Sequence, residues 1–169
     1  MLSESQRMTT AREAAFRVQA PNSLPRVSTI IALDARSEAV MRRVAGFPWT
    51  GSRFLTLVAA RAVSEGLQSL QVDVTLADEA GAHLDLAAAV AATDVVIMVV
   101  SAGEAAEAAA VVGNACHVRG IMTTGIILAD PGEGADPAVT LRDLRPYAAM
   151  LVVAQGEDYV PAMLSALRA

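Results

Sequence analysis

ATDVVIMVVSAG, residues 92–103, is followed directly by Glu104-Ala105-Ala106-Glu107. The run 95–100 is short, uncharged and rich in Val, and it is bounded by Asp94 and Ser101, which predicts a strand buried on both faces of a sheet. Small residues then predict a turn that opens a helix. In open α/β sheets, phosphates bind at such a turn. Here two glutamates stand where a phosphate site has glycines and free N–H groups, so the stretch predicts the fold and disfavours its usual ligand.

Outside this stretch, β-rich runs alternate with alanine-rich segments along most of the chain. Expected strands cover 28–33, 53–58, 70–76, 94–100, 121–128 and 150–153. Expected helices cover 38–45, a short segment ending at Glu65, 84–92, 104–119, 140–147 and 159–167. Such alternation favours right-handed crossovers and helices on both faces of the sheet. We therefore predict an α/β fold over residues 27–169: one three-layer, doubly wound, Rossmann-like domain with a mainly parallel sheet of about six strands.

The composition restricts the class of protein. The 169 residues suffice for one domain with its own core, and the formal net charge of −5 argues against nucleic acid as the partner. No apolar run approaches the ~20 residues that cross a bilayer, so we expect no membrane span. All thirteen basic residues are arginines, which leaves no lysine for a phosphate-binding loop. The single cysteine, Cys116, precludes a disulfide within the chain and favours a cytoplasmic location.

The first 26 residues differ in character from the rest. Arg7, Arg12 and Arg17 lie there among few acidic residues, and the segment PNSLP at 21–25 ends any helix. We predict a flexible or docking N-terminal arm over residues 1–26. A mobile tail and a docking arm for a partner are both open readings of this composition.

Three segments, 29–58, 92–128 and 144–153, resemble in order the nucleotide-binding domain of the tubulin/FtsZ family. The resemblance implies a tubulin/FtsZ-like strand order with strands 28–33 and 94–100 adjacent. In place of the family's two glycine-rich phosphate loops, this chain has Asp34-Ala35-Arg36-Ser37 and Gly103-Glu104-Ala105-Ala106-Glu107-Ala108. Side chains at these positions obstruct a phosphate, and the glutamates repel it. The GTP motifs are thus not retained, and GTP hydrolysis is disfavoured.

The implied strand order defines a candidate ligand crevice at the carboxyl ends of the first and fourth strands. Its carboxylates suit a cationic group, a metal with oxygen ligands, or an arginine from a partner. The alternative is structural: Glu104 complements the positive end of its helix, and Ser37 caps the helix that follows it. The candidate crevice residues are Asp34, Arg36, Ser37, Ser101, Gly103, Glu104 and Asp130.

Two further sequence features bear on function. Phe47 and Trp49 lie in one loop, where they either seal the end of the sheet or anchor an interface. Cys116 and His117 are adjacent on a helix and point about 100° apart, so they cannot form a nucleophile–base pair. With two histidines and one cysteine in the chain, we assign no metal site and no cofactor.

These features lead to two hypotheses about function. The first is a non-catalytic protein on a degenerate tubulin/FtsZ-like nucleotide-binding fold, which acts by protein interaction, by self-association or as a subunit of a complex. The second is a small-molecule, metal or divergent nucleotide-binding protein or enzyme that uses the crevice. We assign no catalytic residue, because no paired carboxylates, Ser-His-Asp order or glycine-rich phosphate cradle can be assembled.

Overall fold

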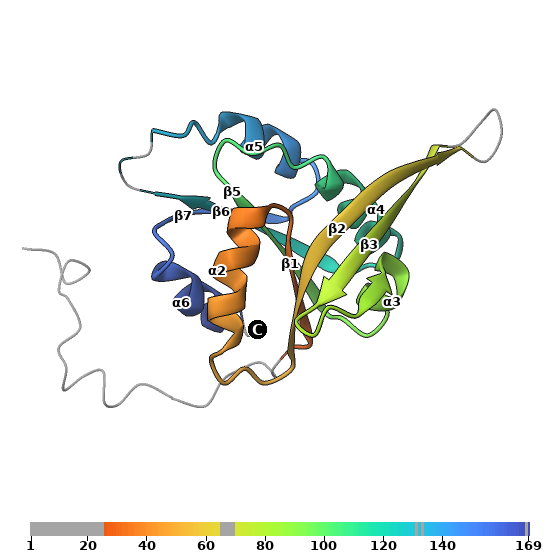
Figure 1. The fold of residues 1–169 in the computed structure, drawn as a ribbon, viewed down its shortest axis with the longest axis horizontal. Helices are drawn as coiled ribbons and strands as arrows, with labels where there is room; N and C mark the ends of the chain where they lie inside the picture. The colour runs from red at the N-terminus through yellow and green to blue at the C-terminus, as the bar shows by residue number, and fades with distance from the viewer. Residues whose placement is uncertain (1–25, 65–69, 131, 133, 168) are drawn as a thin grey trace, which may run out of the picture.

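The computed structural model describes residues 26–64, 70–130, 132, 134–167 and 169 (Figure 1). Most of the predicted N-terminal arm, residues 1–25, therefore lies outside the described residues. The strands are β1 (Ser28–Ala32), β2 (Ser52–Ser64), β3 (Leu70–Asp78), β4 (His83–Asp85), β5 (Val95–Ser101), β6 (Met122–Ala129) and β7 (Met150–Gln155). The helices are α2 (Ala35–Ala45), α3 (Leu86–Val90), α4 (Ala108–Val118), α5 (Ala138–Leu144) and α6 (Tyr159–Ala166).

All the described strands form one sheet in the order β4-β3-β2-β1-β5-β6-β7. The pairs β2–β1, β1–β5, β5–β6 and β6–β7 are parallel. The pairs β2–β3 and β3–β4 are antiparallel. The α/β class and the mainly parallel sheet are thus confirmed. The strand count is seven rather than about six, and the sheet is mixed.

The expected short helix after the second strand is wrong. β2 continues to Ser64 and pairs directly with β3, in a register that runs from Leu55 opposite Asp78 to Ser64 opposite Leu70. The alanine-rich sequence of 59–64 has high helix propensity, but cross-strand pairing with β3 overrides that local preference. The described residues between the starts of β2 and β3 therefore hold no crossover helix, and the two strands project from the body of the molecule as a ribbon (Figure 1).

The expected helix over 84–92 is also wrong in part. Its first residues pair with β3 as the short edge strand β4, and α3 begins only after Asp85, whose carboxylate accepts a hydrogen bond from the Ala88 N–H at 2.6 Å. An Asp at the N-cap satisfies a free N–H of the first turn and so sets the helix start there. The expected helix over 104–119 is shorter as well, because α4 begins at Ala108.

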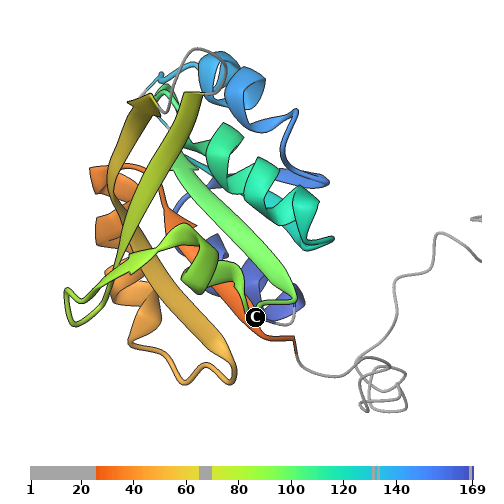
Figure 2. The same ribbon diagram turned by 90° about the vertical axis from the view of Figure 1, so that its right-hand side faces the viewer.

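Two hydrophobic clusters lie on opposite sides of the central strands. Successive residues of β1 alternate between them: Ile30 packs with α2 and α6, and Ile31 packs with α3, α4 and α5. β5 does the same, and all seven of its residues are buried. Figure 2 shows α3 and α4 on the side of the sheet opposite α2. The continuous Val/Ile character of these strands follows from burial on both faces.

Candidate functional site

Asp34 connects the end of β1 to the start of α2. Its carboxylate Oδ1 accepts hydrogen bonds from the backbone N–H groups of Arg36 at 3.0 Å and Ser37 at 2.9 Å. The Ser37 hydroxyl in turn accepts from the Asp34 N–H at 3.1 Å, which completes a capping box. The alternative reading, in which Ser37 caps a helix that follows it, is therefore wrong: the helix begins at Ala35, and Asp34 is its cap.

The same carboxylate also links β1 to β5. Oδ2 accepts from the Ser101 N–H at 2.8 Å, and Oδ1 accepts from the Ser101 hydroxyl at 2.8 Å. Burial of the carboxyl by itself would raise the pKa of Asp34, but the N–H and hydroxyl groups of Ser37 and Ser101 hold that pKa below its ordinary value of 3.8. Asp34 is thus an ionised, fully hydrogen-bonded connector at the point where the crevice was expected.

The loop between β5 and α4 is covered by the segment that leads into α5. The Thr140 hydroxyl, which is buried, lies 2.7 Å from the Glu104 carbonyl oxygen and 3.3 Å from that of Ser101, and donates to them. Gly103 has a φ of +84°, and a Cβ built there would lie 3.7 Å from the Ala135 Cβ. Neighbouring chain therefore lies over the turn that a phosphate would approach.

Asp143 provides a second internal carboxylate. Its Oδ2 accepts a hydrogen bond from the Ala106 N–H at 3.2 Å, just before the start of α4. Ala106 lies two residues before the first residue of α4, so its N–H belongs to the loop between β5 and α4. The hydrogen bond therefore ties this loop to a negatively charged side chain of α5. The sequence analysis did not identify Asp143, which lies three residues after the buried Thr140 and so on the same face of α5.

The remaining crevice candidates separate into a pair and an exposed residue. Arg36 forms an ion pair with Asp130, which follows β6, and each side chain is about one-third exposed, at 35% and 36%. The Glu104 side chain is exposed to solvent. The structure thus brings Asp34, Ser37 and Ser101 into direct contact, joins Arg36 to Asp130, and leaves Glu104 at the surface.

The two aromatic candidates behave differently from one another. The Trp49 indole N–H donates to the Val44 carbonyl at 2.8 Å, and its ring lies 6.1 Å from that of Phe54 at an angle of 54°. Trp49 therefore closes the end of α2 against the sheet. The Phe47 side chain is 53% exposed and remains available for an interface.

Cys116 and His117 do not form a reactive centre. Cys116 is fully buried, and burial raises the pKa of its thiol to about 11, whereas His117 is exposed. No group of three or more His, Cys, Asp or Glu side chains suited to a metal occurs among the described residues. Within the same part of the chain, no helix is long and apolar enough to cross a membrane.

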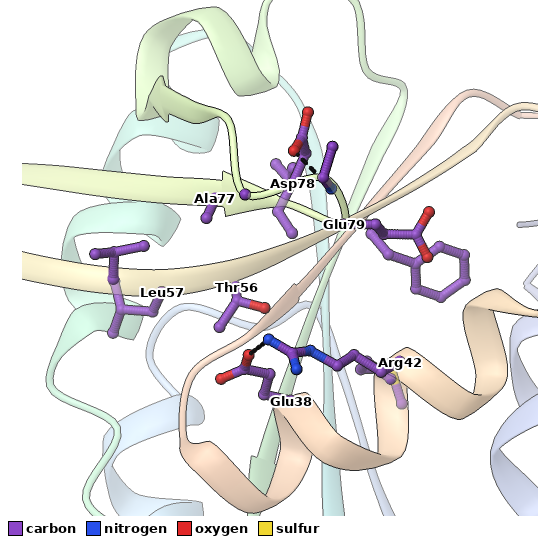
Figure 3. Close-up of a pocket in the computed structure, with 13 residues that line it drawn as sticks. Glu38, Arg42, Thr56, Leu57, Ala77, Asp78 and Glu79 are labelled. Atoms are coloured by element: carbon purple, nitrogen blue, oxygen red, sulfur yellow. Dashed lines mark hydrogen bonds and ion pairs between the residues drawn. The ribbon is translucent and has the colours of Figure 1, made fainter.

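The sequence analysis missed a cavity of about 740 Å³ between α2 and the β2–β3 hairpin (Figure 3). An ion pair between Glu38 and Arg42 lies along its α2 side. On the opposite side, the Asp78 carboxylate holds the turn after β3 by accepting from the N–H groups of Ala80 and Ala82 at 2.9 and 2.8 Å. This space lies on the sheet face that a crossover helix between β2 and β3 would have covered.

Comparison with known proteins does not extend this picture. No protein-family profile matches the chain, and no curated protein matches it at a significant level.

Proposed function

We propose that this chain is a non-catalytic protein on a degenerate, tubulin/FtsZ-like, three-layer nucleotide-binding fold, and that it acts by protein interaction or as a subunit of a complex. The observation that carries the proposal is that two carboxylates of the chain itself accept hydrogen bonds from backbone N–H groups at and just after the carboxyl end of β5, where we infer that a phosphate would have to bind. The carboxylate of Asp34 takes the Ser101 N–H, and the carboxylate of Asp143 takes the Ala106 N–H. A phosphate at either place would displace a carboxylate and lie beside its negative charge.

The exposed parts of the fold support a role in protein contacts. Beyond Leu57, β2 pairs only with β3, so the ribbon of 59–64 and 70–74 has no further strand beside it among the described residues. A two-stranded ribbon is only marginally stable by itself in water. A partner strand that pairs with the ribbon would add hydrogen bonds to its open backbone edge, and a partner that packs on the exposed Phe47 would bury apolar surface.

Thermal unfolding with and without ligands tests the proposal. The ligands are GTP with Mg²⁺, ATP with Mg²⁺, and inorganic phosphate, each at about 1 mM. A ligand that binds with a dissociation constant of about 10 μM is then present at about 100 times that constant and stabilises the chain by roughly 2.7 kcal/mol. For a chain of this size, that corresponds to a rise in Tm of roughly 5–10 °C. We expect no rise for the wild-type chain. A nucleotide-dependent rise that Asp143→Ala increases would show that the site accepts phosphate and would refute the proposal.

A small-molecule function is the second candidate, and the cavity beside α2 favours it. Its volume of about 740 Å³ lies within the roughly 300–1,000 Å³ of ligand pockets. Its lining combines the apolar Met41, Phe54 and Leu57 with the charged Glu38 and Arg42. The same thermal assay with a panel of small acids, amines and divalent metals tests this function. A compound whose stabilisation disappears in Arg42→Ala would place its site at the cavity rather than at the Asp34 crevice.

A further inference from the structure

β7 ends the sheet on the side opposite β4. Its inner edge pairs with β6, and none of the described strands pairs with its outer edge. Alternate N–H and C=O groups of an outermost strand point away from the sheet and can pair with another strand. The outer edge of β7 therefore presents unused hydrogen-bonding groups over the strand's length.

The two edges of the sheet differ in their protection. β4 has three residues, His-Leu-Asp, so it is short and carries an acidic residue. β7 has six residues, Met-Leu-Val-Val-Ala-Gln, with no charge and no proline. Proteins commonly protect edge strands with charges, prolines, bulges or short length. β7 carries no charged residue and no proline, and it is not short, so none of these three devices protects it.

Large apolar side chains are exposed around the same edge. Met150 and Val153 of β7 are 42% and 40% exposed. Tyr159, at the start of α6, is 60% exposed, and Met122, at the start of the adjacent β6, is 50% exposed. Apolar surface gathered beside an open backbone edge favours contact with another apolar edge of the same kind.

We propose that two copies of this chain associate through β7, edge to edge and antiparallel, so that the sheet continues from one copy into the other. A strand that is open, uncharged and apolar is complementary to itself, because an antiparallel pairing lets each copy offer the same donors and acceptors to the other. The occupant of the edge is therefore a second copy.

Symmetry determines the geometry of this contact. The twofold axis must run perpendicular to the sheet, so every side chain stays on its own face, and the residue at the centre of the strand pairs with its own counterpart. Centring on Val152 or Val153 uses most of the strand. In either register, the two Val153 side chains lie on the same face, directly opposite or diagonal, about 5–8 Å apart.

The length of the strand sets the strength of the contact. Six residues span roughly 20 Å. A contact of that length belongs with the smaller interfaces, below about 1,200 Å² of buried surface, which are weak and reversible. The dimer should therefore form and dissociate with concentration rather than exist as an obligate unit.

Sedimentation velocity over a range of concentrations tests the inference, with variants that carry a positive or a negative charge at Val153. The wild-type chain of 17.5 kDa should show a reversible equilibrium with a species of twice its mass. Val153→Lys and Val153→Glu each place like charges side by side across the axis, so each should weaken association by up to about fivefold. An equimolar mixture of the two variants places opposite charges there and should restore the dimer.

Val58→Lys is the matched control, since Val58 is 49% exposed and lies on β2, away from β7. It should associate as the wild type does, and circular dichroism should show all three variants folded. A wild-type chain that stays monomeric at several hundred micromolar overturns the inference. So does a Val153→Lys chain that dimerises normally, a mixture of the charge variants that stays monomeric, or a Val58→Lys chain that loses association. If Val153→Lys does not fold, Val152→Lys and Val152→Glu replace the pair, because the two Val152 side chains also lie directly opposite or diagonal in either register, and the same outcomes are expected.

Discussion

Replacing Asp34 by alanine removes four hydrogen bonds that hold the start of α2 and the end of β5 together. Two come from the helix N–H groups of Arg36 and Ser37, and two come from the N–H and hydroxyl of Ser101. Loss of an Asp cap costs about 0.5–2 kcal/mol. Ser101 is only 2% exposed, and a buried N–H without an acceptor costs about 1–3 kcal/mol. We therefore expect Asp34→Ala to lower the free energy of unfolding by about 1.5–5 kcal/mol.

Asp34→Asn separates the two parts of this loss. Its amide oxygen can replace Oδ1 and still cap α2, since Asn and Asp are similar N-caps. Its amide NH₂ then faces the Ser101 N–H, which has no acceptor left. The free energy of unfolding of Asp34→Asn should therefore lie between that of the wild type and that of Asp34→Ala. Urea unfolding followed by fluorescence of Trp49, the chain's one tryptophan, measures all three free energies.

The pH dependence follows from the lowered pKa of Asp34. A carboxyl whose pKa is lower in the folded state contributes stability above the unfolded value, here near 3.8, and loses it as the pH falls through the folded value. The stability difference between the wild type and Asp34→Asn should be constant from neutral pH down to about 5 and should shrink below about 4. An Asp34→Ala loss below about 1 kcal/mol, or a difference that does not narrow in acid, would refute this account of Asp34.

Two other predictions test the packing on the α4 side of the sheet. Gly113→Ala would place a Cβ 2.5 Å from the Tyr147 Cβ, next to backbone that cannot move aside, so overpacking of about 1–3 kcal/mol should outweigh the helix-propensity gain of about 1 kcal/mol. Gly125→Ala would clash only with the flexible end of the Leu151 side chain, at 2.5 Å, and would make ordinary contacts with Leu144 and Ala148 at 3.4 and 3.5 Å, so it should cost less. Equal or reversed urea midpoints would contradict this. Cys116 should react slowly with a thiol reagent at about pH 8 in the folded chain and rapidly in guanidinium, because burial raises the pKa of its thiol to about 11.

The strands that could be predicted from local sequence are those whose residues favour only one kind of secondary structure. The expected strands at 28–33 and 94–100 are confirmed as β1 and β5, because uncharged β-branched runs of that length are stable only when buried. The segment 59–64 gave a misleading signal: alanine-rich sequence favours a helix locally, and only pairing with β3 makes it a strand. Segments with weak local preference are decided by their neighbours in space.

The candidate site shows the same division. The turn residues Asp34 and Ser101 could be identified from the sequence, since each directly follows or ends a predicted strand. Their direct contact depends on β1 lying beside β5. Asp143 could not be singled out, because a charged residue on a short helix usually lies in solvent and nothing local indicates that it reaches the Ala106 N–H.

The amino-acid sequence by itself determined the α/β class, the buried central strands and the presence of residues with side chains, rather than glycines, at positions 34–37 and 104–108. Each of these depends on residue type within a short window, through hydrophobic burial or through the steric effect of a Cβ. Only the tertiary structure decided that the carboxylates of Asp34 and Asp143 accept from the Ser101 and Ala106 N–H groups, and that β7 is the outermost described strand of the sheet. Those outcomes depend on hydrogen bonds between residues far apart in the chain, which strand order and helix placement bring within reach.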